Sequence, residues 1–338
     1  MNPNWRSFLE SAEGSFDSDS SDLLNFGDAT GELLATRQQT VLVPLTHLGL
    51  LEASGEDVKS FLHGQLTSDI NHLGENQAQH SGWCSAKGRL QASFLVWRNG
   101  ANYQLLLAAD LQEATQKRLQ MFILRAKVKL AALTDDAILL GIAGRQATEA
   151  LTDADLPAPS EALTTASRDG ITVIRLAAER FVIAAPQAAM AQLWQKLSVK
   201  AKPAGVPVWR WLDVEAAHPW VTLATKEEFV PQMADFDKIG GVSFQKGCYP
   251  GQEIVARTQY LGKVKRHLFR LSSPQALSAG AHLYSPDNPD QACGMVMSAA
   301  PSPNGGFSAL AVVQSNFSHD VHLDSRTGPL VQAVAVNP

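Results

Sequence analysis

The stretch Lys246-Gly247-Cys248-Tyr249-Pro250-Gly251-Gln252-Glu253 holds one thiol between glycines and polar side chains. Glycine lets the backbone come close to another group. Lys246 lies two residues before Cys248, and a nearby cation favours the thiolate, the form that acts as nucleophile and metal ligand. The alternative is a buried, inert cysteine in a turn that enters a helix. The density of polar neighbours favours a reactive thiol, with Cys248 and Lys246 as the catalytic candidates.

Length and composition limit the class of protein. The chain has 338 residues, enough for about two domains, and its 45% hydrophobic and 18% charged residues allow a substantial core. The net charge of −5 gives no general electrostatic footprint for nucleic acid. The three cysteines, Cys84, Cys248 and Cys293, are far apart and form no Cys-x-x-Cys pair. This spacing supports neither a zinc site nor a dithiol redox motif, so we expect no bound metal.

The N-terminal part differs in composition from the rest. Residues 11–22 carry five serines and three aspartates with one phenylalanine. Such a segment buries too little apolar surface to offset its ordering entropy, so residues 1–36 are predicted to be a flexible acidic tail. This polar start argues against a secretory or transit peptide. No apolar run approaches eighteen residues, and we expect a cytoplasmic protein without membrane spans.

The rest of the chain is typical of an α+β protein. The Asn99-Gly100 pair predicts a tight hairpin between two strands. A strand–strand–helix pattern appears twice in residues 37–260, which indicates two related α+β subdomains. Residues 261–338 contain short apolar runs between Pro, Gly and Asn turns, a pattern that predicts a small antiparallel β-barrel.

The Lys246–Glu253 stretch resembles the signature of the YgfZ-type folate-binding proteins, relatives of the aminomethyltransferase (T-protein) of the glycine cleavage system. Within the eight positions only Pro250 is variable, and Val255-Ala256-Arg257 follows as in that family. Residues 61–70 and 84–89 also match family segments. The resemblance implies an aminomethyltransferase-like fold, with two ferredoxin-like α+β subdomains and a C-terminal barrel around a central cavity.

The resemblance also implies a set of tetrahydrofolate-binding residues. In the aminomethyltransferases the residue that matches Glu215 binds the pterin, and a carboxylate can accept two parallel N–H bonds from that ring. The alternative for Glu215 is a solvent-facing helix residue. For Thr67 and Asp69 the alternative is helix termination and turn chemistry. The remaining expected ligand-binding residues are Gln65, Gln252, Glu253 and Arg257.

One departure from the relatives concerns catalysis. Aligned on Gly88, the aminomethyltransferases have paired aspartates where this chain has Ala92 and Ser93. Neither side chain can act as a carboxylate base. We therefore expect a retained fold and folate pocket without the activity of a classical aminomethyltransferase. The YgfZ-type branch generally departs at this place, so the departure agrees with the resemblance.

The resemblance implies a folate-binding accessory protein that supports assembly or repair of iron–sulfur enzymes, including tRNA-modifying ones. Cys248 would act by a mixed disulfide, by holding iron transiently, or on a folate-borne one-carbon unit. One thiol cannot hold a cluster alone, so iron–sulfur client or assembly proteins are the expected transient partners. The alternative function is an aminomethyltransferase-like one-carbon transferase.

A binding module without chemistry is a third alternative. Its basis is a basic cluster at Lys263, Lys265, Arg266, His267 and Arg270. The cluster is either a solvated strand face or a site for a polyglutamate tail or RNA phosphates. The acidic net charge and the lack of an interleaved aromatic and basic stripe argue against direct nucleic-acid binding.

Overall fold

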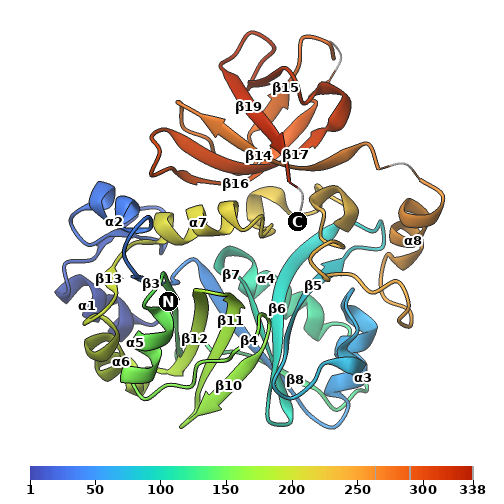
Figure 1. Ribbon diagram of the computed structural model, residues 1–338. Coiled ribbons are helices and arrows are strands. Elements are labelled where there is room, and N and C mark those ends of the chain that lie inside the picture. Colours follow the sequence, from blue (N-terminus) through green and yellow to red (C-terminus); the bar gives the residue numbers. More distant parts are fainter. Residues whose placement is uncertain (263, 289–290, 337–338) are drawn as a thin grey trace.

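The first α+β half is built on a five-stranded antiparallel sheet. The computed structural model describes residues 1–262, 264–288 and 291–336. The strand order is β5-β6-β7-β4-β8 (Figure 1). The strands are β4 (Leu48–Ser54), β5 (Ala78–Cys84), β6 (Leu90–Asn99), β7 (Asn102–Ala108) and β8 (Lys129–Ala132), and the helices are α3 (Val58–Gln65), η1 (Ile70–His72) and α4 (Ala109–Gln120).

Strand β6 lies between two hydrophobic cores. Phe94 and Val96 pack into one core and Leu95 and Trp97 into the other, because alternate side chains of a strand point to opposite faces. The predicted hairpin is confirmed, since β6 ends at Asn99, β7 begins at Asn102, and Gly100 takes a positive φ of 62°.

The second half contains a six-stranded sheet of order β10-β11-β12-β9-β3-β13, in which only β13 runs parallel to its neighbour. Strand β3 lies before the first sheet in sequence, so residues 48–132 are inserted between β3 and β9. The strands are β3 (Val41–Pro44), β9 (Ala137–Ala143), β10 (Thr165–Arg168), β11 (Ile171–Ala177), β12 (Arg180–Pro186) and β13 (Lys202–Pro203). The helices are α5 (Ala147–Asp153), η2 (Gln187–Ala189), α6 (Met190–Leu197) and α7 (Val206–Glu215).

The predicted C-terminal barrel is confirmed as a closed six-stranded barrel of order β14-β17-β16-β15-β18-β19. Helix α7 lies between the barrel and the two sheets and contacts β16 and β17 (Figure 1). The barrel strands are β14 (Arg266–Ser273), β15 (His282–Tyr284), β16 (Gly294–Pro301), β17 (Phe307–Gln314), β18 (Val321–Leu323) and β19 (Leu330–Ala335), with η5 (Ser315–Phe317). The connection to the barrel holds η3 (Leu223–Thr225), η4 (Pro231–Ala234) and α8 (Gln252–Tyr260).

The prediction of a flexible tail over residues 1–36 is wrong. This segment forms α1 (Pro3–Ser11), β1 (Ser15–Phe16), β2 (Leu23–Asn25) and α2 (Ala29–Ala35). Trp5 and Leu9, one helical turn apart, are buried in the core of the second half. Asn2 caps α1 and donates to the carbonyl oxygen of Asp135 at 2.8 Å. These few apolar side chains dock on a surface that the rest of the chain supplies, which offsets the ordering entropy of the polar loop.

In the described ranges no helix combines the length and the apolar character that a membrane span requires.

Candidate functional site

The three sequence segments that carry the family resemblance meet at one place. Thr67, just after α3, donates its hydroxyl hydrogen to the carbonyl oxygen of Gly241 at 2.5 Å. The same hydroxyl oxygen accepts from the N–H of Gly82 at 2.7 Å, and the N–H of Ser243 donates to the carbonyl oxygen of Thr67 at 2.9 Å. Thr67 is fully buried, so its role is to join the loop that precedes Cys248 to α3 and β5.

Two motif glycines are needed where the loop around Cys248 meets the turn at residues 85–88. Gly251 has φ 79° and Gly88 has φ 70°, a region that favours glycine. A Cβ on Gly251 would lie 2.7 Å from Gly88 Cα and closer still to the carbonyl oxygen of Ser85. A Cβ on Gly88 would lie 2.8 Å from Ile254 Cβ. The two backbones can approach this closely only without side chains.

Lys246 holds the loop that contains the Lys246–Glu253 stretch, here called the motif loop, against the end of α3. Its side chain is buried, and its ammonium group donates to the carbonyl oxygens of His63 and Leu66, the second at 2.5 Å. Cations at a helix C-terminus satisfy carbonyls that lack intrahelical partners. Burial lowers the pKa of Lys246 to about 8, against the opposing effects of Asp69 and Cys248. Lys246 thus anchors the loop and places a positive charge near the thiol.

Cys248 is exposed, while the other two cysteines are buried. Burial raises the pKa of Cys84 to about 12 and that of Cys293 to about 11, so both stay as thiols near neutral pH. Cys248 is therefore the cysteine that reagents and partners can reach. In the described parts of the chain no three His, Cys, Asp or Glu side chains are grouped as metal ligands.

Asp69 joins two histidines beside the motif loop. Its carboxylate accepts from the N–H of Asn71 at 2.9 Å and lies 2.8 Å from His72 Nδ1. The Oδ1 atom that accepts from Asn71 also lies 3.3 Å from His63 Nδ1, a ring nitrogen without a hydrogen-bond partner among the described residues. Burial alone would raise the pKa of Asp69, but His72, Asn71 and His63 outweigh it and lower the value. Gln65, at the end of α3, buries its Oε1 without a hydrogen-bond partner among the described residues.

The three predicted residues of α8 differ in exposure and surroundings. Gln252 is half-buried, and Glu253 is exposed in the first turn, where a negative charge suits the helix dipole. Arg257 lines a groove of about 690 Å³ between α8 and the barrel, together with Lys265 and Arg266.

The basic cluster expected from the sequence is not one surface. His267 lies 3.0 Å from a carboxylate oxygen of Asp235, and Arg270 donates to the carbonyl oxygen of Glu215 at 2.6 Å. Lys265 and Arg266 face the groove instead. Lys263 lies outside the described residues.

Glu215 is the last residue of α7, on the side of the barrel. Its carboxylate lies 3.8 Å from the guanidinium group of Arg270 and is 38% exposed, so a further partner can reach it. It lines neither the groove beside α8 nor the cavity described next.

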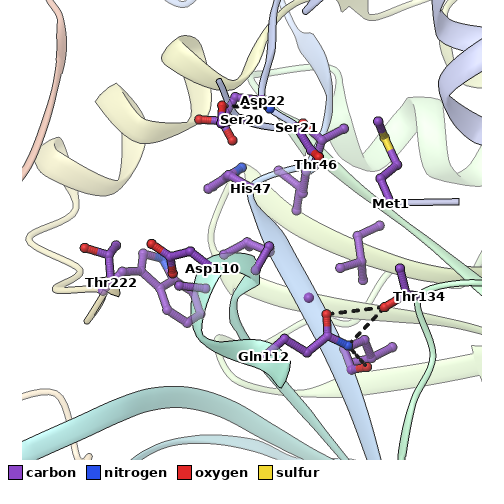
Figure 2. A pocket seen from close by; sticks show the side chains of 18 of the residues that line it. Met1, Ser20, Ser21, Asp22, Thr46, His47, Asp110, Gln112, Thr134 and Thr222 are labelled. Atoms are coloured by element: carbon purple, nitrogen blue, oxygen red, sulfur yellow. Dashed lines mark hydrogen bonds between the residues drawn. The ribbon is translucent and has the colours of Figure 1, made fainter. Parts of the chain in front are cut away.

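A cavity of about 460 Å³ lies elsewhere, between the two halves (Figure 2). Its wall comes from the N-terminal segment, the turn between β3 and β4, the start of α4, α7 and the barrel. None of the site residues predicted from the sequence lines it. The polar lining residues include Asp22, Thr46, His47, Asp110, Gln112, Thr134, Arg210, Asp213 and Ser298. They are scattered over the sequence with no motif spacing, and for this reason sequence reasoning missed them.

The polar side chains of the cavity differ in how many of their polar atoms already have a hydrogen-bond or ion-pair partner. Asp22 forms an ion pair with Arg210 at 2.6 Å, and Gln112 donates to Thr134 at 3.1 Å and to the carbonyl oxygen of Leu50 (Figure 2). Asp110 accepts from the N–H of Leu223 through one carboxylate oxygen at 3.0 Å. Partial burial raises the pKa of Asp110, and that N–H opposes the shift. Asp110 therefore keeps one oxygen for a ligand.

Asp213 belongs to a buried network at the back of the cavity. It pairs with Arg180 at 2.5 Å and accepts from the indole N–H of Trp220 at 3.2 Å. Burial would raise the pKa of Asp213, but Arg180 and His218 outweigh burial and hold it at about 2. His47 nearby has both ring nitrogens buried, and burial lowers its pKa to about 3. These groups support the wall and keep fixed protonation states at neutral pH.

Ala92 and Ser93, which stand where paired aspartates were expected from the relatives, make structural contacts in this chain. Ala92 is fully buried in the first core. Ser93 is buried, and its hydroxyl oxygen accepts from the N–H of Val221 at 2.9 Å. A carboxylate is thus replaced by groups that pack and fix the backbone.

Comparison with known proteins agrees with the fold and the motifs. The family model for the GCVT N-terminal domain matches residues 25–167. The tRNA-modifying protein YgfZ of Cronobacter sakazakii is 33% identical over 241 residues, covering 70% of this chain and 73% of that protein. The protein of the same name from Shigella boydii serotype 4 is 31% identical with the same coverage.

A solved structure extends the likeness to the whole fold. The glycine cleavage system aminomethyltransferase T from Bartonella henselae superposes with a TM-score of 0.85, covering 100% of this chain and 97% of that one at 20% identity. At this identity the likeness concerns the fold, and it confirms the aminomethyltransferase-like architecture. The family follows from the closer relatives and from the motif segments, which meet around Cys248. The chain belongs to the YgfZ family.

Proposed function

We propose that this protein binds a reduced folate and uses Cys248 to support iron–sulfur enzymes, tRNA-modifying enzymes among them. Membership of the YgfZ family supports the proposal, and two of its relatives are named tRNA-modifying proteins. The folate-dependent aminomethyltransferases have the same fold. The observation that carries the role of the thiol is the exposure of Cys248 on a loop that three family segments hold in place.

The 460 Å³ cavity is the proposed folate site. Small-molecule pockets generally measure about 300–1,000 Å³ and combine apolar walls with a few polar groups. Asp22 and Asp213 are already paired with Arg210 and Arg180, whereas Asp110 keeps a free carboxylate oxygen. A pterin offers neighbouring N–H donors that suit such an acceptor.

Glu215 defines a competing placement for the pterin. It has the position that binds pterin in the aminomethyltransferases, and its carboxylate is only loosely paired with Arg270. A folate held by Glu215 would lie on the barrel side of α7, away from the 460 Å³ cavity. Titrations of variants at Asp110 and Glu215 separate the two placements.

The thiol chemistry requires a partner. An iron–sulfur cluster normally has four protein ligands, and Cys248 supplies one. The described residues hold no further group of metal ligands. A mixed disulfide, transiently bound iron and reaction with a folate-borne one-carbon unit all remain compatible with an exposed thiol, and each brings a second molecule to Cys248.

The proposed role can be tested in cells that lack this protein. The full-length chain and its Cys248→Ser variant are compared for the activity of iron–sulfur enzymes and for the level of iron–sulfur-dependent tRNA modifications. The proposal predicts restoration by the wild-type chain and not by Cys248→Ser at equal protein level. Full restoration by the variant would remove the thiol from the mechanism, and failure of the wild-type chain would remove the proposed role.

A further inference from the structure

We propose that the groove between α8 and the barrel binds an acidic, partly apolar segment of the partner protein that reaches Cys248. The inference rests on the proposed role of Cys248 and deepens it, because it names the surface that holds the partner. It depends on neither of the two placements of folate.

One face of α8 is turned toward the groove. The residues of this face are Ile254, Arg257, Thr258 and Leu261, the last at the C-cap. Residues three, four and seven positions apart lie along one side of a helix. The helix buries Val255 in the first core instead. Ile254 is 39% and Leu261 84% exposed, so the apolar part of the groove face remains in contact with solvent. Exposed apolar surface of this kind marks an interaction site.

The two walls of the groove are fixed in place. The side-chain N–H of Gln232 in η4 donates to the carbonyl oxygen of Val255 at 2.7 Å, and this buried bond holds α8. On the barrel side, Arg266 and Gln314 both line the groove and are partners in the pairing of β14 with β17. The groove, about 690 Å³ in volume, is therefore already formed before a partner arrives.

The charge of the groove is opposite to that of the whole chain. Arg257, Lys265 and Arg266 line it, and among the described residues no carboxylate does. The chain as a whole has a net charge of −5. Cations gathered in a hollow raise the local concentration of anions and speed their association. The groove therefore suits an acidic partner that the rest of the molecule would repel.

The apolar side chains of the groove favour a protein segment over RNA. Met233, Ile254, Leu261 and Val264 are aliphatic, and the described lining contains no aromatic ring. Grooves that bind single-stranded nucleic acid generally stack the bases on aromatic side chains. Apolar side chains bordered by charged ones are instead typical of protein interfaces.

The groove is connected to the exposed thiol through α8. Ile254 is the sixth residue after Cys248, so at most about 22 Å of chain separates the two. From Ile254 to Leu261 the helix rises about 10 Å. An extended segment of about ten residues spans roughly 33 Å. One segment of a partner can therefore occupy the groove while its neighbouring residue reaches Cys248.

Mixed-disulfide formation with two model peptides tests the proposal on the full-length protein. Each peptide has about ten residues, the length estimated above, and carries at one end a cysteine joined to 2-thiopyridine by a disulfide. The other end contains leucines with either glutamates or glutamines. The Cys248 thiolate attacks the peptide sulfur, the old disulfide breaks, and the released thiopyridone is followed by its absorbance.

Two corrections isolate the effect of the groove. Cys248→Ser gives the background from the two buried cysteines. Each rate is divided by the rate at which iodoacetamide alkylates the same protein, so that a change in the reactivity of the thiol itself cancels.

At low salt the glutamate peptide should react roughly tenfold faster than the glutamine peptide, because the cations hold it beside the thiol. The advantage should disappear at about 1 M salt, where the Debye length is about 3 Å. Lys265→Glu/Arg266→Glu should abolish it. Arg145→Glu/Arg168→Glu is the matched control, because it reverses two exposed charges in the second half and changes the net charge equally. This control should keep the advantage.

Equal rates of the two peptides with the wild-type protein, or an equal loss in the two double variants, would overturn the proposal. Binding of tRNA that is lost in Lys265→Glu/Arg266→Glu, without a preference between the peptides, would assign the groove to RNA and also overturn it. The assay contains no folate and no iron–sulfur enzyme, so its result is separate from the test of the proposed function.

Discussion

Lys246 illustrates how one residue combines structure and chemistry. From the sequence, Lys246 was a catalytic candidate because it is a cation near the Cys248 thiol. In the structure its ammonium group caps the carbonyl end of α3 and lies 4.9 Å from the centre of the Tyr249 ring. Replacing Lys246 would therefore change the position of the loop as well as the charge near Cys248.

Replacing Lys246 should destabilise the fold. Lys246→Met removes the hydrogen bonds to the carbonyl oxygens of His63 and Leu66 and leaves both without this donor. We expect a loss of about 1.5–3 kcal/mol in the free energy of unfolding, measured by urea denaturation. Lys117→Met is the control, since Lys117 makes only an exposed pair with Glu113, and its effect should stay within about 0.5 kcal/mol. Equal effects of the two variants would contradict the anchoring role.

Acid should destabilise the protein through its buried histidines. His47 has a folded pKa of about 3, well below its ordinary value, and burial lowers the pKa of His80 likewise. Between pH 6.5 and 3 the unfolded chain binds a proton at His47 that the folded chain does not. Stability is therefore lost as the pH falls, by at most about 1.4 kcal/mol per pH unit for each such histidine.

The measurement is the free energy of unfolding at several pH values between 6.5 and 4.5. His47→Gln should show a shallower pH dependence than the wild-type protein, because the titrating group is gone. Parallel curves for the two proteins would mean that His47 is not held neutral in the folded state.

At the level of elements, the contact between the motif loop and the turn at residues 85–88 depends on Gly251. Gly251 and Gly240 have nearly the same φ, 79° and 77°, but a Cβ on Gly251 meets the backbone of Ser85 and Gly88, whereas a Cβ on Gly240 meets nothing within 4 Å. Both substitutions by alanine incur the backbone strain of about 1–2 kcal/mol. Gly251→Ala should add the cost of separating the two segments.

Urea denaturation of Gly251→Ala and Gly240→Ala measures this difference directly. We expect Gly251→Ala to be the less stable variant and to change the rate of Cys248 alkylation, because the loop moves. Equal stability of the two variants would show that the close packing at Gly251 is unimportant.

The elements differ in how well the sequence predicts them. The hairpin at Asn99-Gly100 and the barrel strands follow from local signals, namely turn residues and short apolar runs. The same local reasoning gives a wrong prediction for the N-terminal segment. Helix α1 is ordered through Trp5, whose ring stacks on Phe8 and packs edge-on against Trp194. A contact between residues this far apart has no local signal.

At the scale of the whole molecule, the N-terminal segment completes both a core and a cavity wall. Trp5 is 4% exposed and lines the 460 Å³ cavity. Trp5→Ala should lower the free energy of unfolding by about 3–5 kcal/mol, as for other large buried aromatic residues. Ser7→Ala, on the exposed side of α1, should have little effect. A small effect of Trp5→Ala in urea denaturation would contradict the conclusion that this segment is part of the folded core.

The site divides into a part that the sequence predicts and a part that it does not. The residues around Cys248 come from contiguous family segments, and the structure brings Lys246, Thr67 and Asp69 together there. The cavity was missed because Asp22, Asp110 and Asp213 come from separate elements that meet only when the inserted first half folds against the second.

The most direct test of the account is a calorimetric titration with tetrahydrofolate, without oxygen and under reducing conditions. We expect saturable micromolar binding to the full-length protein, weakened at least tenfold by Asp110→Asn and little changed by Glu215→Gln. Weakening by Glu215→Gln alone would move the pterin to the barrel side of α7 and contradict the placement in the cavity. No binding by the wild-type protein would contradict the claim that this protein is a folate-binding member of its family.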